Sequence, residues 1–130
     1  MSYSNPWTCM YNFGVMDFGA AVGATTHQIA GPAGKKGRLI EVGVTLTEAT
    51  VFATTLGFVR VGIIGDLDAY AELGIATAQA INTTFNSGDD TDALLEEDIP
   101  ADGCIQVTLI EGTGAGLTGQ GQPYVIIDWY

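Results

Sequence analysis

Positive charge is scarce in this chain, and its distribution is uneven. All four basic residues lie in the first sixty positions (Lys35, Lys36, Arg38 and Arg60), whereas the last seventy hold twelve acidic residues and no base. The net charge of −11 therefore comes from the second part of the chain. A surface of this kind lacks the Lys/Arg footprint that nucleic-acid phosphates require, and it disfavours anionic membranes. The charge split instead favours oriented docking on a partner.

Histidine and cysteine are also scarce, which limits the possible chemistry. His27 is the only histidine, so a multi-histidine metal site within one chain is excluded. Neither Cys9 nor Cys104 lies in a recognisable nucleophile context, and no serine does. We therefore predict no catalytic residues, no cofactor and no metal site. A disulfide between the two cysteines stays open, although two buried free thiols are favoured.

Long hydrophobic runs are absent as well. No stretch approaches the roughly 18 apolar residues of a membrane span, and residues 1–20 lack the basic and apolar regions of a signal peptide. Synthesis in a cytoplasm is therefore expected. Hydrophobic residues nevertheless make up 47% of the chain and charged residues only 15%, which suggests that a partner or another copy covers part of the surface.

The apolar residues alternate with polar ones, which is typical of half-buried β-strands. In residues 37–47, Ile40, Val42, Val44 and Leu46 share one face, and Leu39 falls on the opposite, polar face. Three later segments give further inward-facing sets: Val59, Val61 and Ile63; Ile105, Val107 and Leu109, with Gln106 and Thr108 outward; and Val125, Ile127 and Trp129. Short strands separated by Gly, Asp and Pro predict an all-β protein, an antiparallel β-sandwich of jelly-roll type.

Three other segments carry weaker signals. Residues 68–80 are predicted as strand plus turn in preference to a helix that Gly74 would interrupt. Residues 87–103 are rich in carboxylates, but their spacing is not that of a helix–loop–helix calcium site, so a solvated acidic loop is favoured over an ion site. Residues 111–123 contain a formal GxGxxG, yet no βαβ unit surrounds it, so we predict a loop.

Residues 1–34 differ from the rest. Five of the twelve aromatic residues fall in the first eighteen positions, without a clean period. Two interpretations stay open, namely a first strand that completes the core and an extended N-terminal arm that lies on a neighbouring subunit. The turn-rich stretch at 31–37 would separate this segment from a single-domain β-sandwich body, residues 35–130.

The body resembles the small β-sandwich capsid decoration, or cement, proteins found among the head proteins of tailed bacteriophages. The resemblance covers roughly residues 35–130. It lies in strand and turn patterns: GRLIEVGV (37–44), FVRVG (58–62), GDLDAYAEL (65–73), IPAD (99–102), QVTL (106–109) and VIID (125–128). It implies a virion protein on the outer capsid surface, which binds the major capsid protein, associates as a homotrimer and clamps adjacent capsomers, without catalytic residues.

A capsid or subunit interface follows as a hypothesis. We expect it to include the aromatic residues near the start of the chain, the basic cluster and the last two residues: Tyr3, Trp7, Tyr11, Phe13, Lys35, Lys36, Arg38, Trp129 and Tyr130. Trp129 and Tyr130 would either close the sheet or pack against a neighbouring copy. The alternative function is a β-sandwich module of a phage fibre or tail that binds glycans or a host receptor, for which exposed aromatic rings would be the hallmark.

Overall fold

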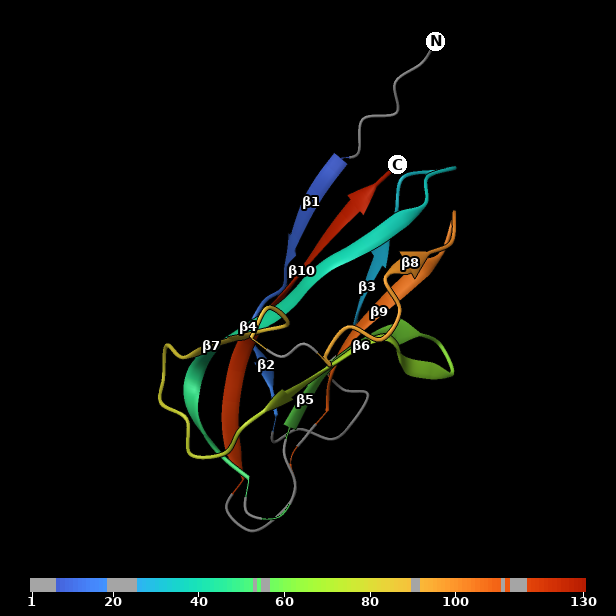
Figure 1. Ribbon diagram of the computed structural model, residues 1–130. Helices are drawn as coiled ribbons and strands as arrows, with labels where there is room; N and C mark the ends of the chain where they lie inside the picture. Colours follow the sequence, from blue (N-terminus) through green and yellow to red (C-terminus); the bar gives the residue numbers. More distant parts are fainter. Residues whose placement is uncertain are drawn as a thin grey trace.

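Ten β-strands and no helix make up the regular structure of the residues that the computed structural model describes, which are 7–18, 26–52, 54, 57–89, 92–110, 112 and 117–130 (Figure 1). In chain order the strands are β1 (Trp7–Asn12), β2 (Met16–Asp17), β3 (Thr26–Ala30), β4 (Gly37–Val51), β5 (Gly57–Ile63), β6 (Asp66–Ile75), β7 (Thr84–Asn86), β8 (Asp98–Ile99), β9 (Cys104–Ile110) and β10 (Thr118–Trp129).

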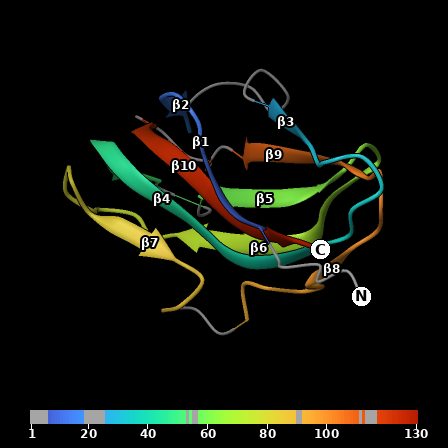
Figure 2. The same ribbon diagram turned by 90° about the horizontal axis from the view of Figure 1, so that it is seen from above.

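The strands form two antiparallel sheets. The first sheet has the order β1-β10-β4-β7, with β2 also paired to β10 and β8 to β4. The second sheet has the order β3-β9-β5-β6. Figure 2 shows the strands of the first sheet crossing in front of those of the second. The predicted antiparallel β-sandwich is therefore confirmed.

The core lies between the sheets and is filled from alternate strand positions. The prediction for the last strand is confirmed, because Val125, Ile127 and Trp129 are all buried. In β9 the inward positions are likewise buried, but Gln106 and Thr108 were predicted to face outward and are buried too. Thr108 lies beside the edge strand β3, where its hydroxyl is 3.3 Å from that of Thr26, so a hydrogen bond offsets the burial of this polar group.

Two β-bulges break the predicted alternation. Ile126 pairs with Glu41 and Ile127 with Leu39, so Ile40 is an extra residue in β4. Leu39 is consequently 1% exposed, whereas Ile40, which was predicted to face inward, is 42% exposed. A similar irregularity between Val61 and Ile63 in β5 leaves Ile63 exposed, again against the prediction. A bulge reverses the inside–outside pattern beyond it, and periodicity alone does not reveal it.

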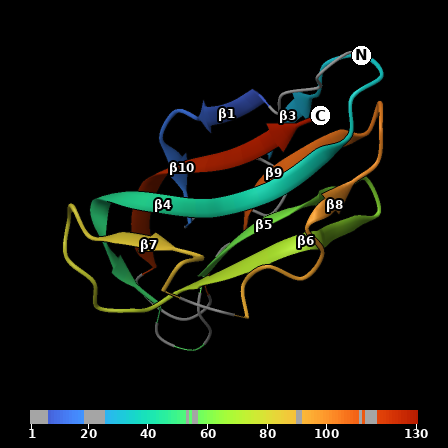
Figure 3. The same cartoon turned by 45° about the horizontal axis from the view of Figure 1, so that its top comes forward.

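The described parts of residues 1–34 include strands of both sheets. β1 pairs with β10 along its whole length, and β3 pairs with β9 in the other sheet. Figure 3 shows β1, β10 and β4 side by side. The separation of an arm from the body at residue 34 stays a prediction.

The segments with weaker signals have mixed outcomes. Residues 68–80 contain most of β6 followed by a turn, as predicted. The acidic connection contains the short strand β8, and its apolar residues Ala93 and Ile99 are buried in the core. The predicted loop at 111–123 is wrong for its last part, because β10 already begins at Thr118.

Candidate functional site: a basic and aromatic end of the first sheet

The beginning of β4 and the end of β10 meet at one end of the first sheet. The Lys36 N–H donates to the Tyr130 carbonyl and the Tyr130 N–H donates to the Lys36 carbonyl, both at 2.9 Å. These two bonds continue the β4–β10 ladder past Gly37 and Trp129. β1 begins at the same end, because Trp7 pairs with Trp129. Residues from three distant parts of the sequence are thereby brought together.

Two cation–π contacts join the bases and aromatic rings at this end. The Lys35 ammonium lies 5.5 Å from the centroid of the Trp7 ring, and the Arg38 guanidinium lies 6.0 Å from that of Tyr130. Such contacts at exposed sites are worth about 0.5–1 kcal/mol each. Trp7 is 55% exposed and Tyr130 37% exposed, so both rings keep surface available to a partner. We call Trp7, Lys35, Lys36, Arg38 and Tyr130 the basic–aromatic end.

The bases of this end form no ion pair with any residue in the part of the chain that the structure describes. Among the described residues, the one ion pair joins Arg60 to Glu72 at 2.7 Å on the second sheet. Arg38 has an acid on each flanking strand, Asp128 on β10 and Asp98 on β8. Asp128 instead accepts a hydrogen bond from the Thr8 hydroxyl at 2.5 Å. Because the cations are not saturated by neighbouring carboxylates, they can contact acidic groups of another molecule.

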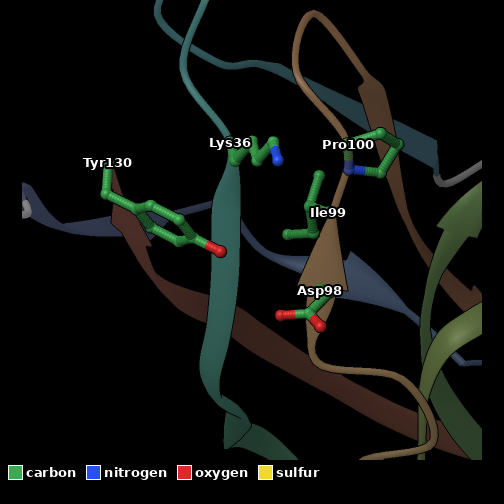
Figure 4. A pocket seen from close by; sticks show the side chains of 5 residues that line it. All are labelled: Lys36, Asp98, Ile99, Pro100 and Tyr130. Atoms are coloured by element: carbon green, nitrogen blue, oxygen red, sulfur yellow. The ribbon is translucent and has the colours of Figure 1, made fainter.

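A small pocket opens beside the basic–aromatic end. Lys36, Asp98, Ile99, Pro100 and Tyr130 line it, with a volume of about 320 Å³. Figure 4 shows Ile99 and Pro100 on one side and the Tyr130 ring on the other, with the Lys36 ammonium above and the Asp98 carboxylate below. Apolar walls with one charge of each sign suit a single partner side chain better than a reaction.

The structure adds Asp98, Ile99 and Pro100 to the residues expected at this site. They were assigned to a solvated loop on account of their acidic neighbours. The adjacent apolar pair Ile99-Pro100 within a run of acids was the available signal that part of this loop returns to the sheet. β8 brings the pair beside β4, where Gly37 pairs with Ile99.

Three other predicted interface residues make contacts within their own chain. Trp129 is only 1% exposed, and its indole N–H donates to the Tyr11 hydroxyl at 2.8 Å. This burial matches the alternative in which the end of the chain closes the sheet. Burial also raises the pKa of Tyr11. Phe13 stacks on His27 of β3 with ring centroids 5.1 Å apart, and so links the two sheets. Tyr3 lies outside the described residues.

The cysteines are free, as favoured, but their predicted burial is wrong for Cys104, which is exposed at the start of β9. Cys9 is half-buried in β1. Within the described ranges, no group of three or more His, Cys, Asp or Glu side chains is arranged to hold a metal ion. A search of the same ranges for a helix with the length and apolar character of a membrane span found none.

Comparisons with known proteins give a match among the solved structures. No protein-family model matches the chain, and no curated protein sequence matches it. Among solved structures, a chain of the cyanophage Pam1 capsid asymmetric unit is similar, with a TM-score of 0.51 and 12% sequence identity. The alignment covers 99% of this chain and 89% of that chain. At this identity the likeness concerns the fold, which is the β-sandwich described above.

Proposed function

We propose that this protein is a structural, non-enzymatic component of a phage particle that binds the outer surface of the capsid and reinforces contacts between shell subunits. The observation that carries the proposal is the similarity of nearly the whole sandwich to a chain of the cyanophage Pam1 capsid asymmetric unit. The resemblance of residues 35–130 to decoration proteins, which rests on the sequence alone, leads to the same class.

The basic–aromatic end supports such a role physically. Partly exposed tryptophan and tyrosine rings are the side chains that most often anchor protein interfaces. Lys35, Lys36 and Arg38 add cations that a strongly acidic protein needs in order to approach an acidic patch. A capsid presents many equivalent sites, so a contact of modest area suffices when neighbouring copies also contact each other. We propose the major capsid protein as the partner and a homotrimer as the bound form.

The direct test is co-sedimentation with capsids of the phage that encodes the protein, prepared without it. Purified protein is mixed with these capsids and pelleted, and the bound copies per particle are counted by quantitative mass spectrometry. Hundreds of copies per particle are expected. A dozen or fewer would indicate a joining ring and contradict the decoration role, and protein left in the supernatant would overturn capsid binding altogether. Multi-angle light scattering of the free protein gives the number of chains in the oligomer.

Charge variants test the attachment site. The double substitution Lys35→Gln and Lys36→Gln should weaken binding at least tenfold at low salt, and the difference should shrink as salt screens the remaining charges. Arg60→Gln is the control, because Arg60 is a base of the second sheet and lies away from the basic–aromatic end. Equal losses from the control and the lysine pair would contradict the assignment of the site.

A further inference from the structure

The outer face of the first sheet carries apolar side chains on three neighbouring strands. On this face Met10 of β1 pairs with Ile126 of β10, and Ile126 pairs with Glu41 of β4 next to the bulged residue Ile40. Met10 is 55% exposed, Ile40 is 42% exposed and Ile126 is half-buried between them. We call Met10, Ile126 and Ile40 the apolar band. This band differs from the sequence-based prediction, in which Ile40 faces the core.

The bulge in β4 is what completes this band. With regular pairing, the alternation of residues 37–47 would turn Ile40 toward the core and Leu39 away from it. The extra residue keeps Leu39 and Val42 buried and leaves Ile40 on the outer face beside Glu41. Bulges commonly re-aim a side chain next to a functional surface. An exposed apolar row bordered by polar residues is typical of a contact surface.

The apolar band is continuous with the basic–aromatic end. The next row on the outer face consists of Thr8, Asp128 and Arg38, paired across the same three strands. The Arg38 guanidinium lies over the ring of Tyr130, which follows β10 directly. The outer face of this sheet thus presents apolar side chains at its middle and Arg38 with the Tyr130 ring at its end, whereas Trp7, which pairs with the buried Trp129, lies on the opposite face.

We propose that the outer face of β1, β10 and β4 is the docking surface, and that it receives a patch of the shell subunit with apolar side chains bordered by acidic residues. This inference rests on the proposed function. Charge selects the occupant, because three of the four bases of a chain with net charge −11 lie at this end and form no ion pair among the described residues.

Methionine oxidation tests the proposal on the unaltered protein. Thioether oxidation requires access, so Met10 should oxidise readily in the free protein, and Met16, which is 3% exposed, should oxidise slowly. The protein is treated with dilute hydrogen peroxide, free and bound to the same capsids, and sulfoxide at each residue is followed by mass spectrometry. We expect oxidation of Met10 to slow at least fivefold on the capsid. An unchanged rate in pelleted protein would overturn the docking face.

Substitutions provide the second measurement. Met10→Asp and Ile40→Asp place a carboxylate in the apolar band, and Ile64→Asp is the matched control, since Ile64 is 78% exposed in the turn between β5 and β6 of the other sheet. We expect at least tenfold weaker capsid binding for the first two and a change below twofold for the control. Thermal unfolding verifies that each variant is folded.

The outcomes separate this inference from the proposed function. If the wild-type protein does not pellet with capsids, the proposed function fails. If it pellets and the two band variants bind as tightly as the Ile64 variant, the function stands and the docking surface is wrong. If Met10 is already protected in the free protein and the protein is oligomeric in solution, another copy occupies the band and the shell subunit is excluded as its partner.

Discussion

Replacement of Gly37 by alanine should destabilise the protein through a single methyl group. A Cβ at this position would lie 2.7 Å from Cζ3 and 3.0 Å from Cε3 of Trp129, and 3.2 Å from a methyl carbon of Ile127. The ring cannot simply move away, because its N–H is bonded to Tyr11 and the ring also lies close against Gly31. Overpacking of this kind costs about 1–3 kcal/mol. Reduced freedom of the unfolded chain returns about 0.4–1 kcal/mol, so the net loss is roughly 0–2.6 kcal/mol, and the loss relative to an unhindered glycine-to-alanine change is about 1–3 kcal/mol.

The free energy of unfolding is measured by urea denaturation, with thermal unfolding as a second probe. For a domain of this size, each kcal/mol corresponds to a fall of about 3–4 °C in Tm. Gly14→Ala is the control, because a Cβ there meets no atom within 4 Å. It should be neutral or slightly stabilising. If Gly37→Ala is as stable as Gly14→Ala, the close packing of Trp129 against β4 is refuted.

Two further predictions concern tyrosines. Burial, followed by the hydrogen bond and negative charge of Glu41 and by the charge of Asp89, raises the pKa of Tyr124 to about 12. Because an unfolded chain releases this proton near pH 10, the stability due to the neutral phenol is complete below pH 10 and is lost as the pH rises to 12. Urea midpoints should therefore fall more steeply over this range for the wild type than for Tyr124→Phe, and parallel curves would contradict the burial. Tyr11→Phe leaves the buried indole N–H of Trp129 without its acceptor. This should cost about 1–3 kcal/mol in urea unfolding, and a loss below 0.5 kcal/mol would show that the bond is dispensable.

The fold class was predictable because alternation is local information. In β9 and β10 the two-residue alternation of apolar side chains predicts which positions face the core. The structure buries these positions: Ile105, Val107, Val125 and Ile127. The prediction failed at Ile40 and Ile63, where an extra residue in one strand shifts the pattern. A bulge depends on the partner strand, so a pattern within one strand does not contain it.

The site was predictable in its residue types and not in its geometry. Bases and exposed aromatic rings are recognisable from sequence as contact-forming residues, and Trp7, Lys35 and Tyr130 do meet at one end. Their meeting depends on the pairing of β4 with β10 and of β10 with β1, which joins segments separated by most of the chain. Alternation already placed Trp129 on the inward face with Val125 and Ile127, although the interface hypothesis also included it. The structure buries its ring against Gly31 and Gly37 and leaves Tyr130 exposed.

Pro123 determines how long the edge of the first sheet is. Its carbonyl accepts a hydrogen bond from the Phe13 N–H at 3.1 Å, so its nitrogen, which has no proton to donate, faces the same side. That side holds the gap between β1 and β2, where a continuous strand from Trp7 to Asp17 would otherwise pair with β10. The proline thereby divides what would be one long edge strand into the two short strands β1 and β2. Short edges limit sheet-to-sheet aggregation between copies at high protein concentration, so this proline protects the free protein from aggregation.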